Sequence, residues 1–176
     1  MDSVGSGASL RRKEIACDSA AFAELGASLL ALNKSLRFRA RGQSMHPLVR
    51  DGDLLTVEPV DVQSRRRGDL VFYRNPRGEA VVHRLVRRLG QGASASIETK
   101  GDGLPESDGL VPAPEIFGRV TAIERNGVRI GMRQPGIRLL GLGATLLGPS
   151  SSSRIRAIPW LKALLQKAPV FARYLA

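Results

Sequence analysis

Apolar residues between positions 37 and 131 occur in short runs, several of which alternate with polar residues. Such runs are typical of half-buried strands, and turn signals such as Asp51-Gly52 and Asn126-Gly127 separate them. The pattern predicts strands at residues 37–40, 53–57, 69–73, 80–89, 95–99, 116–124 and 128–130. Short strands with frequent turns and little helix predict a mainly β fold, as a closed or partly closed barrel or as paired sheets.

The N-terminal part follows a different pattern. Residues 20–32 carry apolar side chains at the three-to-four spacing of a helix, at Phe22, Leu25, Leu29 and Leu32. This spacing predicts a short amphipathic helix whose apolar face caps the barrel.

The C-terminal part is basic and apolar. Its last stretch, residues 154–176, has helical spacing and a tryptophan at Trp160, and it is interrupted by Pro159 and Pro169. We predict a short interfacial helix that contacts a membrane surface, or else packs on its own domain or on a partner. The chain divides into an N-terminal segment with a short helix, residues 1–36, a β domain, residues 37–131, and this C-terminal extension, residues 132–176.

The charge of the chain is strongly positive. Its 176 residues carry a formal net charge of +11, and the sequence pI is about 11.1. Such a charge favours anionic partners, either phospholipid headgroups or nucleic acid. Arginines spread over solvated faces would give the same charge without either partner, and we do not expect nucleic acid binding.

The cysteine and histidine counts exclude several kinds of site. Cys17 is the sole cysteine, so no disulfide framework or CxxC metal site can form within the chain. The two histidines, His46 and His83, are too few for a histidine-rich metal site, and no nucleotide motif occurs. The sequence therefore predicts no cofactor and no metal.

No stretch of the sequence is long and apolar enough to predict a membrane-spanning helix, which needs about 18 or more such residues. The N-terminus also lacks the pattern of a secretory signal. We expect a peripheral membrane protein or a cytoplasmic one.

The polar residues that carry chemistry fall at three places. A serine lies on a turn in the run Gly42-Gln43-Ser44-Met45-His46-Pro47. A histidine follows at His83, and the acids Asp102 and Asp108 come after it. A hydroxyl, an imidazole and a carboxylate are the parts of an activated serine nucleophile, its base and the group that orients the base.

These residues resemble the S26 signal peptidase family, in its archaeal, endoplasmic-reticulum and sporulation-type branch that pairs serine with histidine. The resemblance runs from about residue 39 to about residue 124 and covers six boxes in the family's order. They are Ser44 to Pro47, Gly52-Asp53, Gly68-Asp69, His83-Arg84, Gly101-Asp102 with Asp108, and Gly118-Arg119-Val120. The resemblance implies a compact β fold and serine endopeptidase activity on an extended peptide with small side chains before the cut. Relatives are usually anchored in the membrane by helices, which this sequence does not predict.

The base and its orienting acid are inferred from the chemistry of the candidates. Neutral imidazole accepts a proton near pH 7, whereas lysine must be buried to do so, which favours His83 over the rival Lys100. The resemblance implies Asp108 as the carboxylate on His83, with Asp102 shaping the loop or adding to the field. Glu106 is a weaker third candidate.

The sequence provides fewer clear candidates for the donors of the oxyanion site than for the nucleophile and its base. The backbone N–H of Ser44 is the natural first donor. Gly42 occupies the place where many relatives carry a second donor, a serine, and the side-chain amide of Gln43 is a substitute. We expect Met45 to line the substrate cleft and Pro47 to rigidify the turn.

Three functions compete. The first is a signal-peptidase-type serine endopeptidase that acts through Ser44 and His83 and forms an acyl-enzyme. The second is a self-cleaving regulator like the bacterial repressors, which share the Ser-Met box but use lysine as base and carry a DNA-binding domain. The third is a non-catalytic basic module that binds anionic lipid or nucleic acid. The joint presence of serine, histidine and both acids favours the first.

Overall fold

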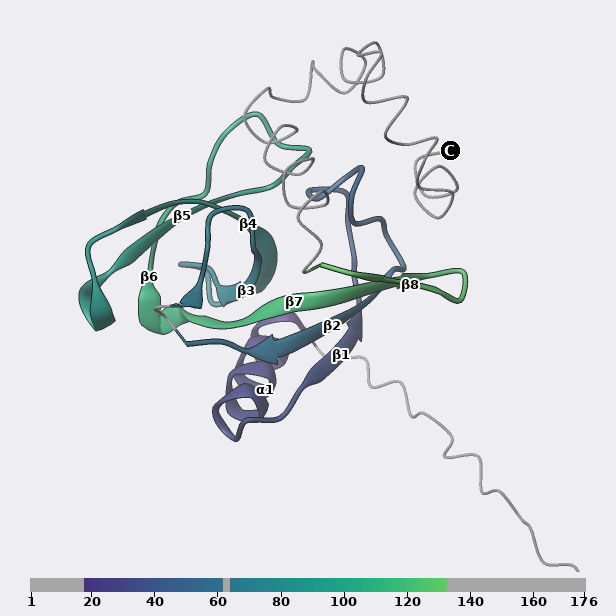
Figure 1. The fold of residues 1–176 in the computed structure, drawn as a ribbon, viewed down its shortest axis with the longest axis horizontal. Coiled ribbons are helices and arrows are strands. Elements are labelled where there is room, and N and C mark those ends of the chain that lie inside the picture. Colours follow the sequence, from purple (N-terminus) through teal and green to yellow (C-terminus); the bar gives the residue numbers. More distant parts are fainter. Residues whose placement is uncertain (1–17, 62–63, 133–176) are drawn as a thin grey trace, which may run out of the picture.

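The structure, a computed structural model, describes residues 18–61 and 64–132. In this part of the chain, one α-helix precedes eight strands (Figure 1). The elements are α1 (Ser19–Ala31), β1 (Leu36–Arg39), β2 (Leu54–Pro59), β3 (Leu70–Arg74), β4 (Ala80–Leu89), β5 (Ser96–Lys100), β6 (Gly109–Pro112), β7 (Ile116–Arg125) and β8 (Val128–Gly131), with short 3₁₀ turns η2 (Gly92–Ser94) and η3 (Ala113–Glu115). The C-terminal helix predicted from the sequence lies outside the described residues.

The strands form one antiparallel sheet in the order β1-β2-β7-β3-β4-β5-β6, and β8 pairs with β7. The predicted mainly β fold is confirmed. The sheet is open, with β1 and β6 at its edges, so the expectation of a closed barrel is corrected. Both edge strands have four residues, and in the described part of the chain they do not pair with each other.

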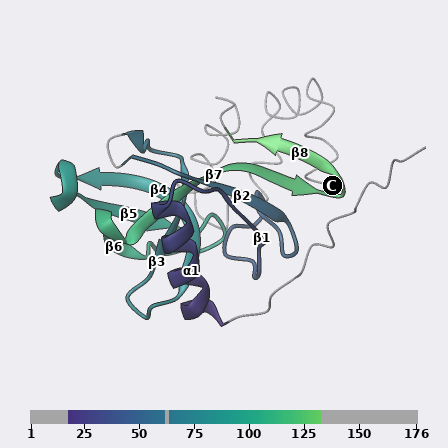
Figure 2. The same cartoon turned by 90° about the horizontal axis from the view of Figure 1, so that it is seen from below.

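Three register shifts bend the sheet. They lie at Thr56/Val57 in β2, at Phe72/Tyr73 in β3 and at Leu85/Arg87 in β4. Such irregularities increase the local twist of a strand. The strong bend is visible in both views of the sheet (Figures 1 and 2).

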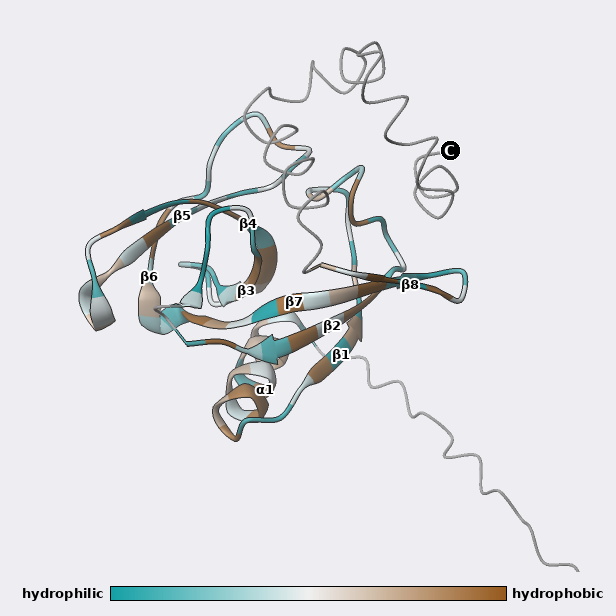
Figure 3. Cartoon of the chain, viewed as in Figure 1, coloured by the Kyte–Doolittle hydropathy of each residue, from teal (hydrophilic) through white to brown (hydrophobic). Residues whose placement is uncertain are grey.

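The main core packs α1, together with Met45 and Val49 of the loop after β1, against the sheet. Brown and teal segments alternate along β1, β2 and β7, because successive side chains of a strand point to opposite faces (Figure 3). The core cluster includes Leu30, Leu55, Val57, Phe72 and Ile123. A second, smaller cluster joins β3, β4, β5 and β6 and contains Val71, Tyr73, Leu85, Ile97, Val111 and Ile116.

Helix α1 packs by a face that overlaps the predicted one, because Phe22 and Leu29 contact the core. Its buried residues are Ala23, Gly26 and Leu30, whereas Leu25 is 46% exposed and Leu32 is 71% exposed. Gly26 sets this orientation, because a Cβ at this position would lie 2.6 Å from Cε1 of Phe72. The helix therefore approaches the sheet through small residues, which hydrophobic spacing alone does not reveal.

Replacing Gly26 with alanine is expected to destabilise the fold. The added methyl would overlap the Phe72 ring, and overpacking of this kind costs about 1–3 kcal/mol. Alanine is favoured over glycine in a helix by only about 1 kcal/mol, which does not offset the larger part of that range. Urea unfolding of Gly26→Ala measures the loss, and Ser28→Ala on the exposed side of the same helix is the control. A Gly26→Ala protein as stable as wild type would contradict this packing.

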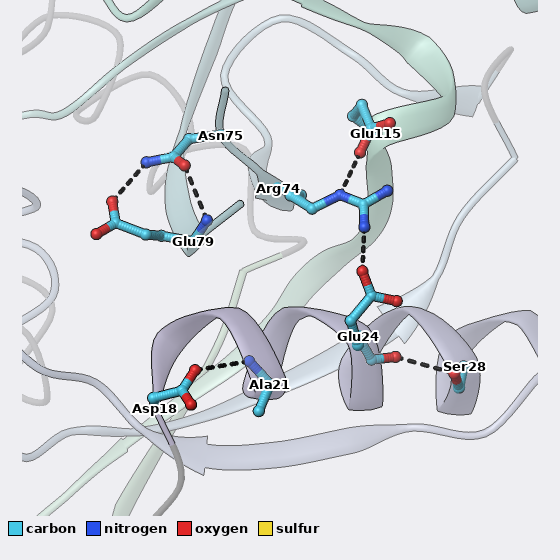
Figure 4. Close-up of polar contacts among 8 residues, drawn as sticks. All are labelled: Asp18, Ala21, Glu24, Ser28, Arg74, Asn75, Glu79 and Glu115. Atoms are coloured by element: carbon cyan, nitrogen blue, oxygen red, sulfur yellow. Dashed lines mark hydrogen bonds and ion pairs between the residues drawn. The ribbon is translucent and has the colours of Figure 1, made fainter. Parts of the chain in front are cut away.

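Polar contacts also hold α1 on the sheet (Figure 4). The helix begins at the N-cap Asp18, whose carboxylate accepts from the backbone N–H groups of Ala20 and Ala21 at 2.9 and 2.8 Å. Arg74 of β3 pairs with Glu24 of the helix and, at 2.7 Å, with Glu115. Because Arg74 lies at the surface, its pair with Glu24 contributes little to the stability of the helix contact.

The loop that follows β1 and the loop that follows β5 rise on the side of the sheet away from α1 (Figure 1). These two loops carry Ser44 and the acids Asp102 and Asp108. None of the described helices has the length and apolar character needed to cross a membrane.

Candidate active site

Ser44 lies on a tight loop between β1 and β2. Gly42 begins the loop with φ of 88°, a left-handed conformation that favours glycine, and its N–H donates to the Asp51 carboxylate at 2.8 Å. The backbone then turns, because the N–H of His46 donates to the carbonyl of Gln43 at 3.0 Å. These bonds fix the serine at the tip of a rigid turn.

His83 faces Ser44 from β4. It pairs in register with Val71 of β3, and only 6% of it is exposed. Its Nε2 atom lies 2.9 Å from Oγ of Ser44, and its Nδ1 atom lies 2.7 Å from Oδ2 of Asp108. With the ring proton on Nδ1 and donated to Asp108, Nε2 accepts the hydrogen bond of the serine hydroxyl.

Asp108 is held by the strand beside it. Its backbone N–H donates to the carbonyl of Thr99 at 2.8 Å, and its side chain is 22% exposed. Burial raises the pKa of this carboxyl, but hydrogen bonds and charge from His83, with contributions from Thr99 and Tyr73, outweigh burial. The net result is an Asp108 pKa below its ordinary value, so the carboxylate is ionised wherever His83 can act as a base.

The lowered pKa of Asp108 makes the stability of the fold depend on pH. A carboxyl whose pKa is lower in the folded state stabilises the fold above its unfolded pKa, and the contribution disappears as pH falls through the folded value. We expect the contribution of the Asp108 carboxylate to the stability difference between wild type and Asp108→Asn to be present above the ordinary aspartate pKa and to shrink below about pH 4. Urea midpoints at a series of pH values measure it. A difference that persists unchanged to about pH 2 would contradict the assigned direction.

Asp102 is directed at Arg84 and not at His83. Nε and Nη2 of Arg84 donate to the two carboxylate oxygens of Asp102 at 2.7 and 2.5 Å, and Nη1 donates to the carbonyl of Gly68 at 2.8 Å. The side chains of Arg84 and Asp102 are 0% and 1% exposed. Of the two acids left open by the sequence, the structure thus places Asp108 on the histidine.

Two further sequence candidates are not members of the hydrogen-bond path from Ser44 through His83 to Asp108. Lys100 ends β5 and stands opposite Arg84 in the β4–β5 register, and His83 contacts the Ser44 hydroxyl in its place. Glu106 is exposed in the loop between β5 and β6.

Two glycines beside Asp102 allow its loop to pack against the serine. A Cβ at Gly101 would lie 2.6 Å from the carbonyl oxygen of Ser44, and one at Gly103 would lie 3.1 Å from the carbonyl oxygen of Gln43. The N–H of Gly103 donates to the carbonyl of Ser44 at 2.9 Å. The buried Arg84–Asp102 pair therefore supports the backbone of the serine. The sequence indicated that Asp102 shapes its loop or adds to the field at His83, but it did not indicate the close approach of Gly101 and Gly103 to the serine backbone.

Gly101→Ala is expected to lower activity more than it lowers stability. The added Cβ meets a backbone oxygen, so Ser44 itself must move, and a displacement of about 1 Å at a reacting group costs about 10²-fold in rate. Gly131→Ala is the matched control, because no heavy atom lies within 4 Å of the added Cβ. Steady-state kinetics with unfolding curves separate the two effects. Wild-type kinetics for Gly101→Ala would contradict the close approach.

Comparison with known proteins identifies the family of the chain. The family model described as Peptidase S24-like matches residues 8–98, just over half of the chain. The chain belongs to this family. It is also similar to the signal peptidase complex catalytic subunit sec11 of Sclerotinia sclerotiorum, with 32% identity over 126 residues. That match covers 69% of this chain and 64% of the relative, so the chain spans less than two thirds of the relative's length. No solved structure gave a significant match.

Family membership and this relative bear out the resemblance to the S24/S26-type peptidases drawn from the sequence. The catalytic roles of Ser44, His83 and Asp108 remain proposals, which the geometry above supports.

Three residues beside Ser44 were expected to shape the cleft of this S24-like peptidase. Gln43 is exposed and its backbone carbonyl closes the turn, while Pro47 is half-buried within the loop. Met45 is only 4% exposed and belongs to the main core, so the expectation that it lines the cleft is corrected. Its side chain points inward and anchors the loop by apolar contact.

The two Gly-Asp pairs that open β2 and β3 build matching turns. The carboxylate of Asp53 accepts from the N–H of Arg50, and that of Asp69 accepts from the N–H of Arg66, each at 2.8 Å. Both acids also pair with an arginine of β7, Asp53 with Arg125 and Asp69 with Arg119. These boxes position β2 and β3 on either side of β7.

The described residues contain no cluster of three or more histidine, cysteine, aspartate or glutamate side chains that would bind a metal ion.

Proposed function

We propose that the protein is a serine endopeptidase of the signal peptidase type, with Ser44 as nucleophile, His83 as base and Asp108 as the carboxylate that orients the base. One observation carries the proposal, the continuous hydrogen-bond path from Ser44 Oγ through the His83 ring to Asp108 Oδ2. Membership of the S24-like peptidase family and similarity to a signal peptidase catalytic subunit support the same conclusion.

The contacts give each group a defined step. Nε2 of His83 takes the hydroxyl proton of Ser44 as Oγ attacks the carbonyl carbon of the peptide bond. Asp108 stabilises the imidazolium that forms, since it accepts from Nδ1. The same proton passes from Nε2 to the leaving amine, and the acyl group stays on Oγ. Water then attacks the ester with His83 again as base, and Ser44 is restored.

The negative oxygen of the intermediate needs donors near Ser44. The backbone N–H of Ser44 supplies the first, and the exposed side-chain amide of Gln43 is the candidate for the second. Gly42 has no side chain to take that part.

The comparison also supports a substrate class. The similar fungal protein is named as the catalytic subunit of a signal peptidase complex. A precursor protein with a signal-type segment is accordingly the proposed substrate, bound in an extended conformation beside the Ser44 loop.

Cleavage of a synthetic signal-type peptide tests this function. We expect wild-type protein to cut it internally at one position after a small side chain, and Ser44→Ala to leave it intact. Lys100→Ala should cut like wild type, because His83 holds the place of the base. Cleavage by Ser44→Ala at the wild-type rate, or its loss in Lys100→Ala with the fold retained, would overturn the assigned roles. Cleavage of the enzyme's own chain in place of the peptide would support self-processing.

A further inference from the structure

We propose that Asp51 is a positioning residue of this site. Its carboxylate holds the backbone of Gly42 and thereby keeps the hydroxyl of Ser44 aligned with Nε2 of His83. This inference rests on the proposed function. It adds an acid that lies in none of the boxes from which the catalytic chemistry was inferred.

The contact between Asp51 and Gly42 closes the base of the serine loop. Oδ1 of Asp51 accepts from the N–H of Gly42 at 2.8 Å. Beside it, the N–H of Gly52 donates to the carbonyl of Ala40 at 2.9 Å. Ser44 follows Gly42 by two residues, so a shift of the Gly42 backbone reaches the nucleophile through a single intervening residue.

The two ends of the serine turn are held by different kinds of contact. The downstream end is fixed by packing, because Met45 and Val49 are each 4% exposed and belong to the main core. Gly42 at the upstream end is exposed, and a Cβ built there would meet no heavy atom within 4 Å. Within residues 18–61 and 64–132, the carboxylate of Asp51 is the one hydrogen-bond partner of the Gly42 backbone.

Gly42 needs such a restraint because glycine has the largest backbone freedom of any residue. Its φ of 88° lies in the left-handed region, and glycine exchanges this conformation for others at little cost. Such an exchange would rotate the backbone that leads to Ser44, whose Oγ must stay 2.9 Å from Nε2 of His83. The bond from Asp51 therefore selects the backbone conformation in which the hydroxyl reaches its base.

Asp51 is itself carried by a fixed turn. The N–H of Asp53 donates to the carbonyl of Arg50 at 3.1 Å, and the N–H of Arg50 donates to the Asp53 carboxylate at 2.8 Å. Asp53 also pairs with Arg125 of β7, and the two side chains are 2% and 10% exposed. The turn is thus tied to the sheet, and Asp51 reaches from it to Gly42. A carboxylate oxygen accepts a backbone N–H more strongly than a neutral oxygen does.

Asp51→Ala and Asp51→Asn test the inference, because the first removes the acceptor and the second keeps an acceptor oxygen at the same place. We measure kcat and KM on a signal-type peptide, and the rate of acylation by a fluorophosphonate probe. Asp51→Ala is expected to lower kcat and the acylation rate by about tenfold to 10²-fold, as for a displaced reacting group. Its KM should change less than about twofold, because the alignment matters in the transition state. Asp51→Asn should stay within about threefold of wild type, since a neutral acceptor is weaker but present.

Two further measurements separate positioning from loss of stability or of charge. Exchange of the Gly42 amide proton with solvent, followed by NMR, should be faster in Asp51→Ala, while the urea midpoint should change little because Asp51 is exposed. Glu106→Ala is the matched control, because it removes an exposed acid from the other loop of the site. It should keep the wild-type rates and the wild-type exchange at Gly42.

Each outcome decides a separate question. Wild-type kcat and acylation rates for Asp51→Ala would overturn the positioning role and leave the peptidase proposal intact. Equal losses in Asp51→Asn and Asp51→Ala, or in Glu106→Ala, would also overturn it, because they assign the effect to charge. A fall in kcat that only matches the unfolded fraction of Asp51→Ala would do the same. Wild type that is folded but not labelled would overturn the proposed function itself, and with it this inference.

Discussion

Asp108→Asn is expected to lower kcat for peptide cleavage about 10⁴-fold while the protein stays folded. The amide keeps the shape of the side chain but can present its N–H to Nδ1 of His83. The imidazole then carries its proton on Nε2, so this atom can no longer accept the hydrogen bond of the Ser44 hydroxyl. Steady-state kinetics on a signal-type peptide measure the rate, and circular dichroism with urea unfolding measures the fold.

Glu106→Gln is the matched control for this substitution. It makes the same change of carboxylate to amide two residues away, on an exposed side chain of the same loop. We expect its kinetics to equal those of wild type. Equal losses in Glu106→Gln and Asp108→Asn would mean that the charge of the loop, and not contact with His83, controls the rate.

Asp102→Ala is expected to be among the most destabilising single substitutions in the described chain, at about 3–5 kcal/mol. It leaves the Arg84 guanidinium buried and without its carboxylate, where both side chains were almost fully excluded from water. That cost is a large fraction of the roughly 5–15 kcal/mol that stabilises an ordinary domain. Urea unfolding of the purified variants gives the difference directly.

The exposed pair Arg87–Glu98, which joins β4 to β5, provides the control. Its side chains are 61% and 22% exposed, so Glu98→Gln should cost less than about 1 kcal/mol. Replacing both buried partners, as Arg84→Met with Asp102→Leu, should cost less than Asp102→Ala alone, because no charge stays unpaired. A mild Asp102→Ala effect, similar to that of Glu98→Gln, would contradict the account of the buried pair.

The sheet was largely predictable because its signals are local. Alternating apolar residues and turn sequences placed seven of the strands close to their observed positions, including β4 at residues 80–89 and β7, which spans Ile116–Arg125. Strand β6 was missed. It begins at Gly109 and ends at Pro112, and three of its four residues are exposed, so it has neither the composition nor the alternation of a half-buried strand.

Errors arose where side-chain size and tertiary contact decide the outcome. The buried face of α1 depends on the close fit of Gly26 against Phe72, which a hydrophobic pattern cannot encode. Met45 was assigned to the cleft because it adjoins Ser44, but neighbouring residues of a turn point in different directions, and Met45 points into the core.

The site residues were predictable as a set more than as individual partners. The order of serine, histidine and acids indicated the chemistry, and the structure brings Ser44, His83 and Asp108 together. A role for Asp102 in shaping its loop was among the expectations, but its pairing with Arg84 was not, because that pairing depends on Arg84 pointing to the opposite side of β4 from His83.

The most direct test of the central claim is to identify the atom that is acylated. Full-length protein is treated with a fluorophosphonate probe, its intact mass is measured, and the modified residue is mapped by fragmentation of its peptides. The account predicts one adduct, on Ser44, that is lost in Ser44→Ala and strongly slowed in His83→Ala. An adduct on another residue, or folded wild-type protein that is never modified, would contradict it.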